Sequence, residues 1–234
     1  MIEAVLFDLD DTLLDHDGAS LAALEAALER EHPGIEGDRH RAAVVEWRRL
    51  EELHYRSYLD GEIDVGEQRR RRAGGLLEWL GKPSRPATDL DAWYEEFLAG
   101  YRGHWSLFED VEPALDGLER AGYALGVITN AEGEAQRLKL AAMGIERRLP
   151  LVVASAEVGV AKPDAGIFAA ACDRLGCPPE RVAYVGDRLE TDARGASEAG
   201  LRGIWLFREG GDIQGSGTSD IATIATLHEL LPLL

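Results

Sequence analysis

Seven residues of this chain could together hold a divalent cation and a phosphate group, and they fall in four short polar segments. They supply four carboxylates, a hydroxyl, an amide and an amine: Asp8, Asp10, Thr129, Asn130, Lys162, Asp187 and Asp192. Hard oxygen ligands of this kind are those that Mg²⁺ takes, and backbone amides that open a helix can face an anion. Because aspartate is a nucleophile in covalent phosphoryl transfer, the pair Asp8 and Asp10 suggests a nucleophile next to an acid and base.

Each polar segment is preceded by a short apolar run of the kind that forms a buried parallel strand. Strands are expected at 3–7, 123–128, 151–154, 182–186 and 203–207, with helices at about 112–120, 132–143, 164–175 and 192–199. This alternation predicts an α/β fold with a parallel sheet and right-handed crossovers. Ligands bind beyond the carboxyl ends of such strands, so one sheet edge would gather the polar residues. The Gly- and Ser-rich stretch at 209–219 is expected to be a surface loop, before a short strand and a closing helix.

Between about residues 16 and 107 the apolar residues have the spacing of helices. Leu21, Leu24 and Leu28 fit one helix face, and Trp93 and Phe97 belong to another. Four helices are expected, and the proline-rich segment separates the last two. An all-helical block therefore interrupts the α/β domain just after its first polar segment. There it would act as a lid, with a purely structural insertion as the alternative.

Each signal has an ordinary alternative when it is taken alone. Carboxylates such as Asp8 and Asp10 often stabilise turns, and Asp192 suits the start of a helix as well as a metal site. Lys162 could be a surface lysine, and Asp164 is expected only to cap the helix that follows it. The order of the four segments, each at a strand end, is what favours a common site.

In this order, the four segments resemble the motifs of the haloacid dehalogenase-like hydrolase superfamily. They are Asp-x-Asp-x-Thr at 8–12, Thr-Asn at 129–130, Lys-Pro at 162–163 and Gly-Asp-x-x-x-x-Asp at 186–192. The stretch 155–164 is similar to phosphatase-like members that carry a helical cap. The resemblance implies a Rossmann-like three-layer core made of residues 1–15 and 108–234, with an inserted helical cap domain at 16–107.

The resemblance also implies roles for the residues that act on the phosphoryl group. Asp8 would attack phosphorus and form an aspartyl-phosphate. Asp10 would protonate the leaving oxygen and then activate the hydrolytic water. Thr129, Asn130 and Lys162 would hold the phosphoryl oxygens, and Lys162 would also restrain the nucleophile. The expected function is thus a phosphatase that acts on a small phosphorylated metabolite.

Mg²⁺ is the cofactor that the resemblance implies. Its ligands would be Asp8, the backbone carbonyl of Asp10, and Asp187, while Asp192 would lie behind the metal or reach Lys162. A cation there offsets the repulsion between an anionic nucleophile and an anionic phosphate.

Two departures from the family pattern fall inside the motifs. Ala131 follows Thr-Asn where the family often has glycine, and Arg188 follows Gly-Asp where it often has serine or asparagine. Arg188 and His16, just past the first motif, are candidate substrate contacts. A phosphomutase is the alternative function, followed by a 2-haloacid dehalogenase and a non-catalytic binder of a phosphate ligand. Sugar phosphates, nucleoside monophosphates and small phospho-acids all remain open as substrates.

Composition limits the partners and the compartment. The formal net charge of −18 argues against binding to nucleic acid or to an anionic membrane, because both need a basic face. Cys172 and Cys177 are the only cysteines, and we expect two reduced thiols in a cytoplasmic protein. The oligomeric state is left open between monomer and homodimer.

Overall fold

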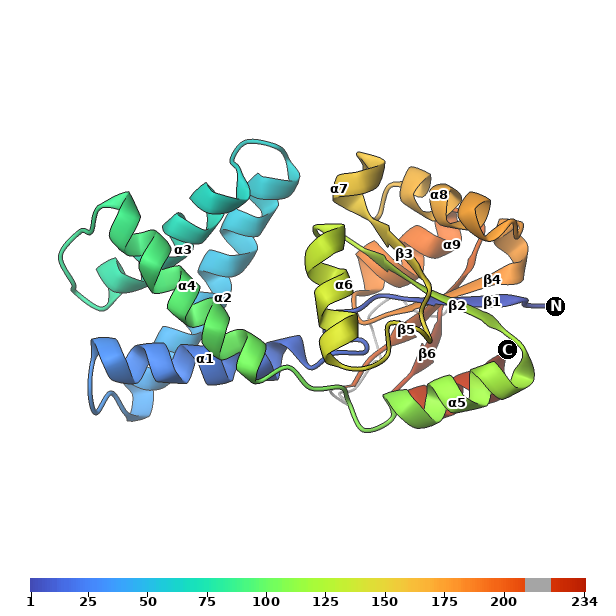
Figure 1. The fold of residues 1–234 in the computed structure, drawn as a ribbon, viewed down its shortest axis with the longest axis horizontal. Helices are drawn as coiled ribbons and strands as arrows, with labels where there is room; N and C mark the ends of the chain where they lie inside the picture. The colour runs from blue at the N-terminus through green and yellow to red at the C-terminus, as the bar shows by residue number, and fades with distance from the viewer. Residues whose placement is uncertain (209–219) are drawn as a thin grey trace. The chain divides into compact units, whose positions relative to one another are not determined.

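The computed structural model describes residues 1–208 and 220–234, and the chain divides into two compact units (Figure 1). One unit joins Met1–Asp15 to Trp105–Leu234, and the other is His16–His104. The loop expected at 209–219 lies outside the described residues. Within the part of the chain that is described, no helix has the length and apolarity needed to cross a membrane.

The first unit is built on a six-stranded parallel sheet with the order β3-β2-β1-β4-β5-β6. The strands are β1 (Ala4–Phe7), β2 (Ala124–Thr129), β3 (Leu151–Ala154), β4 (Val182–Gly186), β5 (Arg202–Leu206) and β6 (Ala222–Ile224). In the central strand β1, Phe7 lies beside Val127 of β2 and Val185 of β4. Because these strands are parallel and in register, the segments that follow them emerge at one edge of the sheet.

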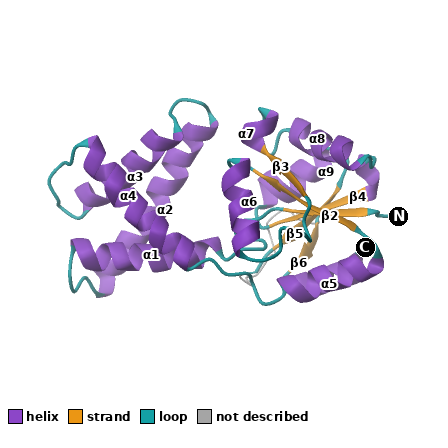
Figure 2. Ribbon diagram, viewed as in Figure 1, coloured by secondary structure: helices purple, strands orange, loops and turns teal. Residues whose placement is uncertain are grey.

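Helices cover both faces of the sheet and make three layers, as Figure 2 shows. Val5 and Phe7 pack with apolar residues of α5, α6 and α10 on one face, whereas Leu6 packs with α8 and α9 on the other. This alternation is the period of a strand that is buried on both faces. The helices are α5 (Val111–Ala121), α6 (Gly133–Ala142), α7 (Ser155–Val158), α8 (Ala165–Leu175), η1 (Pro179–Arg181), η2 (Leu189–Arg194), α9 (Gly195–Glu198), η3 (Leu227–Glu229) and α10 (Leu230–Leu233). The predicted α/β class with a three-layer core is confirmed.

The segment expected to form one helix at 192–199 has a different form. Its first part, η2, is a π-helix that begins at Leu189, and only α9 is α-helical. The wider turn is visible in the backbone N–H of Ala193, which donates to the carbonyl oxygen of Arg188 at 3.4 Å. One extra residue in a turn leaves no clear mark in the apolar spacing, so the sequence pattern missed it.

Helix ends elsewhere agree with the sequence. Asp164 caps α8, because its Oδ1 accepts a hydrogen bond from the backbone N–H of Gly166 at 2.7 Å. Gly122 ends α5 with a φ of 86°, the left-handed conformation that glycine adopts without a steric penalty.

Residues 13–15 and 106–108, which we call the neck, lie where the chain leaves the first unit and where it returns. Leu14 forms an antiparallel bridge with Leu107. The backbone N–H of Asp15 donates to the carbonyl oxygen of Ser106 at 3.0 Å, and that of Phe108 donates to Leu13 at 3.1 Å. The two ends of the inserted segment are therefore joined by main-chain hydrogen bonds.

The second unit is all-helical, as predicted. It consists of α1 (His16–Glu31), α2 (Gly37–Leu59), α3 (Val65–Trp79) and α4 (Ala87–Gly103). Its centre holds a cluster of aromatic rings, in which the centroid of Trp47 lies 4.7 Å from that of Phe97 and Trp93 stacks on Phe97 at 6.1 Å. Aromatic pairs at these distances add to the apolar burial that holds the bundle together.

The same unit contains an ion pair between the half-buried Glu51 of α2 and the buried Arg72 of α3. Nη2 of Arg72 lies 2.7 Å from Oε1 of Glu51, and Nη1 donates to the hydroxyl of Tyr94 at 2.8 Å. The guanidinium group also lies over the ring of Trp47, 4.3 Å from its centroid. Burial would raise the pKa of Glu51, but Arg72 and His16 outweigh it and lower that pKa to about 2.

Candidate active site

Asp8 is the first residue beyond β1 and begins the site. Its backbone N–H donates to the carbonyl oxygen of Val185 at 2.8 Å, so the residue is fixed against the end of β4. The residue is 8% exposed. Its Oδ1 lies 2.6 Å from Nζ of Lys162, although the two residues are far apart in the sequence.

Lys162 is the buried cation of the site. Its Nζ donates to Asp8 at 2.6 Å, to Oδ1 of Asp192 at 2.7 Å and to the hydroxyl of Tyr184 at 2.8 Å. An ammonium group has three protons, and three acceptors are present. The main chain of Lys162 is held by the Asn130 side chain, which accepts from its N–H at 2.6 Å and donates to its carbonyl at 2.8 Å. The Thr-Asn and Lys-Pro segments are thus joined directly.

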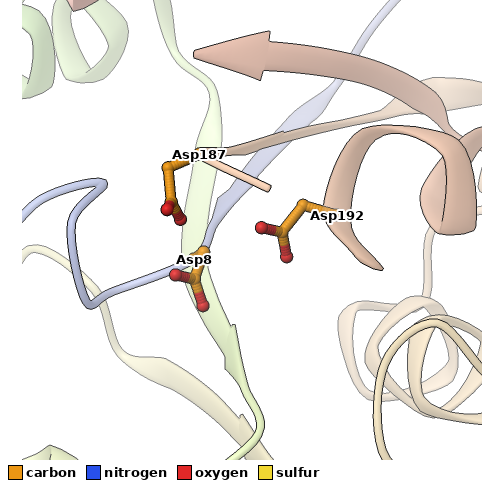
Figure 3. Close-up of side chains that lie close together, drawn as sticks. All are labelled: Asp8, Asp187 and Asp192. Atoms are coloured by element: carbon orange, nitrogen blue, oxygen red, sulfur yellow. The ribbon is translucent and has the colours of Figure 1, made fainter. Parts of the chain in front are cut away.

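Three carboxylates converge next to this lysine (Figure 3). One oxygen from each of Asp8, Asp187 and Asp192 lies within 4.8 Å of the others. Gly186 permits this approach, since a Cβ atom there would lie 2.5 Å from Cβ of Asp192. Asp192 was expected behind the metal or reaching Lys162; it reaches Lys162 and also lies within the carboxylate cluster.

The cluster carries more negative charge than its protein neighbours balance. Burial raises the pKa of Asp8 to about 7, with Asp192 and Asp187 adding to the effect and Lys162 opposing it. The pKa of Asp187 is also raised to about 7, by burial and then by Asp192 and Asp11. Carboxylates that are costly to ionise together are what a bound divalent cation stabilises, and oxygen donors suit Mg²⁺. The residues present therefore fit a metal of this kind.

Asp10 belongs to a neighbouring group of side chains. Both of its carboxylate oxygens accept from Nζ of Lys139, at 2.6 and 2.8 Å. Nε2 of Gln136 donates to Oδ2 of Asp10 at 3.3 Å and to Oγ1 of Thr129 at 3.3 Å. The predicted acid and base is thus linked to the predicted phosphate-binding hydroxyl through α6.

The two candidate substrate contacts have other environments. His16 lies in the helical unit, where its Nδ1 is 2.6 Å from the hydroxyl of Tyr101 and its Nε2 is 3.8 Å from Oε1 of Glu51. Arg188 is exposed, and its backbone N–H donates to Oδ2 of Asp192 at 3.0 Å. A role for either side chain toward substrate remains a prediction.

Three residues of the site escaped the sequence reasoning, namely Tyr184, Lys139 and Gln136. Tyr184 lies within the apolar run of β4, where an aromatic residue looks like core, yet its hydroxyl bonds Lys162 and the carbonyl oxygen of Ile128. Lys139 and Gln136 lie on a helix that appeared to be only a connection. One signal was available: Lys139 is one of only three lysines in the chain.

Known proteins resemble this chain along most of its length. The chain is 36% identical over 211 residues to the glyceraldehyde 3-phosphate phosphatase of Methanopyrus kandleri, covering 89% of this chain and 85% of that one. It is 32% identical over 229 residues to the phosphoserine phosphatase of Thermus thermophilus, covering 88% and 89%.

Among solved structures, the putative HAD-hydrolase YfnB from Bacillus subtilis, bound to magnesium, has the same fold. The TM-score is 0.80 at 23% identity, with 100% of this chain and 98% of that chain covered. The sequence profile of haloacid dehalogenase-like hydrolases matches residues 2–200. With its four motifs gathered at one edge of a parallel sheet, this chain belongs to the haloacid dehalogenase-like hydrolase family.

Proposed function

We propose that this protein is a Mg²⁺-dependent phosphatase that hydrolyses a small phosphorylated metabolite through an aspartyl-phosphate. The observation that carries the proposal is the buried Lys162, which joins Asp8 to Asp192 beside a third carboxylate, Asp187. A nucleophilic carboxylate needs a fixed cation next to it when the incoming group is an anion. Lys162 supplies that charge, and its 6% exposure keeps water from screening it.

In the first half-reaction, a carboxylate oxygen of Asp8 attacks phosphorus. A new bond forms between that oxygen and phosphorus, and the bond from phosphorus to the ester oxygen breaks. Asp10 gives its proton to the leaving oxygen, so that an alcohol departs and Asp10 becomes a carboxylate. Thr129 and Lys162 hold the phosphoryl oxygens during the transfer.

In the second half-reaction, the carboxylate of Asp10 takes a proton from water as the water oxygen attacks phosphorus. The bond from phosphorus to Asp8 breaks, which returns the Asp8 carboxylate and releases inorganic phosphate. One residue thus serves as acid and then as base, a contribution worth roughly 10²–10⁴-fold in rate.

Asp8, Asp187 and the backbone carbonyl of Asp10 are the proposed metal ligands, with Asp192 beside them. When bound, Mg²⁺ would neutralise charge on the phosphoryl oxygens and on the carboxylates around them. The raised pKa values of Asp8 and Asp187 support a cation at this place.

The relatives support the substrate class. Proteins over 30% identical to this chain are named for glyceraldehyde 3-phosphate and for phosphoserine, both of which are small phosphate monoesters. The exposed Arg188, next to Asp187 in the sequence, is a place where this chain would differ in preference.

The test is phosphate release from a panel of phosphate monoesters that includes these two compounds, with Mg²⁺ and after treatment with EDTA. We expect release that depends on Mg²⁺ and favours some members of the panel. Asp8→Asn should abolish it, because an amide oxygen is a poor nucleophile, whereas Asp10→Asn should only slow it. Full activity in Asp8→Asn protein, or no release from any monoester with Mg²⁺ present, would overturn the proposal.

A further inference from the structure

We propose that Lys139 and Gln136 are positioning residues that hold the Asp10 carboxylate for its two proton transfers. This inference rests on the proposed phosphatase function and extends it to α6, which contributes none of the residues that the family motifs cover. The relevant atoms are all within the α/β unit, so the inference does not depend on the helical unit.

Lys139 donates to both oxygens of the Asp10 carboxylate. Its Nζ lies 2.6 Å from Oδ1 and 2.8 Å from Oδ2 of Asp10, and the lysine is 7% exposed. The Lys139 side chain is 9% exposed and that of Asp10 is 29% exposed, and a charged pair that is partly shielded from water is screened less than a surface pair. The contact therefore restricts the rotation of a side chain that would otherwise move in a solvent-facing turn.

Gln136 adds a second restraint from the same helix face. Residues three apart on a helix are neighbours, so Gln136 and Lys139 both point toward Asp10. Nε2 of Gln136 is 3.3 Å from Oδ2 of Asp10 and 3.3 Å from Oγ1 of Thr129. The buried amide of Gln136 thus fixes the position of the Asp10 carboxylate relative to the Thr129 hydroxyl, which would hold the phosphoryl group.

The use of lysine in this chain is selective. Lys82, Lys139 and Lys162 are its only lysines, whereas arginine occurs 22 times. Two of the three are buried, and each pairs with one aspartate of the first motif. A compact ammonium group needs less room beside these carboxylates than a planar guanidinium would. The ion pair of Lys139 with Asp10 parallels that of Lys162 with Asp8.

The pairing has a direct consequence for the chemistry. When Asp10 gives its proton to the leaving oxygen, it becomes an anion, and the ammonium group of Lys139 is already in place to stabilise that charge. Such help matters most when the leaving oxygen is a poor leaving group that must be protonated as it departs. It matters little when the leaving group is stable as an anion.

The experiment compares Lys139→Met with wild-type protein on an alkyl phosphate from the active panel and on p-nitrophenyl phosphate. For both substrates, kcat/KM reports the half-reaction in which the leaving group departs. We expect kcat/KM for the alkyl phosphate to fall by roughly 100-fold, a loss typical of a misplaced catalytic group, and that for p-nitrophenyl phosphate to fall far less. Lys139→Arg, which keeps the charge, should recover part of the loss.

Two controls separate the possible failures. Lys82→Met replaces the remaining lysine, which belongs to the helical unit and has no proposed catalytic or binding role, and should leave both values at the wild-type level. An equal fall for both substrates in Lys139→Met protein would mean a general structural defect and would overturn the positioning role. No turnover of either substrate by wild-type protein would instead count against the proposed function itself.

A second measurement does not need activity or the Lys139→Met variant. With lysine labelled by ¹³C and ¹⁵N, only three side-chain signals arise, and Lys139→Arg identifies one of them by its loss. We expect Asp10→Asn to shift the Lys139 signal more than that of Lys82. An unchanged Lys139 signal in Asp10→Asn protein would contradict the ion pair on which the inference depends.

Discussion

Two carboxylates that each lie beside a buried cation, Asp8 in the α/β unit and Glu51 in the helical unit, have pKa values shifted in opposite directions. Both lie within 3 Å of a buried cation: Asp8 is 2.6 Å from Lys162, and Glu51 is 2.7 Å from Arg72. Yet the pKa of Asp8 is raised to about 7 and that of Glu51 is lowered to about 2.

The difference lies in how many anions share each cation. Lys162 serves Asp8 and Asp192 with Asp187 close by, whereas Glu51 receives Arg72 and has His16 nearby. The helical unit therefore balances its buried charge with its own side chains. The α/β unit keeps three carboxylates around one lysine, an arrangement that a divalent cation could stabilise, whereas the pair of Glu51 and Arg72 balances its own charge.

Replacing the shared cation should give the largest effect. We expect Lys162→Met to lower kcat by roughly 10²–10³-fold, because it removes a fixed charge next to the nucleophile and the phosphoryl oxygens. Steady-state assays with the preferred phosphate monoester measure this loss, and Lys82→Met is the matched control. Wild-type kcat in the Lys162→Met protein would mean that the cation is not needed for chemistry.

Removing the charge of Glu51 should affect stability. At neutral pH we expect Glu51→Gln to lower the free energy of unfolding by about 2–3 kcal/mol, because the buried Arg72 loses its charged partner. The pKa of Glu51 is 4.5 in the reference state and about 2 in the folded protein. Its stabilisation is thus complete above pH 4.5 and is lost as the pH falls toward 2.

Chemical denaturation of both proteins at several pH values measures the difference. The gap between wild-type and Glu51→Gln protein should be constant near neutrality and should narrow in acid. A difference in unfolding free energy that increased as the pH fell would contradict a lowered pKa for Glu51.

Adding Mg²⁺ to the wild-type protein should give the smallest effect. We expect Mg²⁺ at about ten times its Kd to stabilise the folded protein by about 1.4 kcal/mol, seen as a rise in Tm. Asp187→Asn should weaken this response because it removes a carboxylate from the cluster. If Mg²⁺ leaves the Tm of wild-type protein unchanged, the carboxylate cluster does not bind the metal.

Strand ends were the predictable part of the site. Asp8, Thr129 and Asp187 each follow or end an apolar run, so one parallel sheet must bring them to a common edge. Asp164 as a cap also followed from a local rule, because capping depends on backbone geometry over a few residues.

Some contacts made across the fold were not predicted, although those of Lys162 with Asp8 and Asp192 were. Tyr184 lies in the middle of the apolar run that forms β4. No neighbouring residue in the sequence indicates that its hydroxyl accepts from Lys162. Lys139 approaches Asp10 only after α6 has packed against the sheet, a tertiary event that spacing along one helix does not encode. The π-helix at Leu189–Arg194 was missed because one inserted residue barely alters the pattern.

The neck between residues 13–15 and 106–108 has a consequence for how such enzymes diversify. Main-chain bonds such as that from Asp15 to Ser106 hold the two ends of the helical segment side by side, whatever lies between them. Because the cost of closing a loop rises only slowly with its length, the segment can be lengthened, shortened or exchanged with little effect on the sheet. Exchanging His16–His104 for the corresponding segment of a relative would thus leave the sheet and its carboxylate cluster in place.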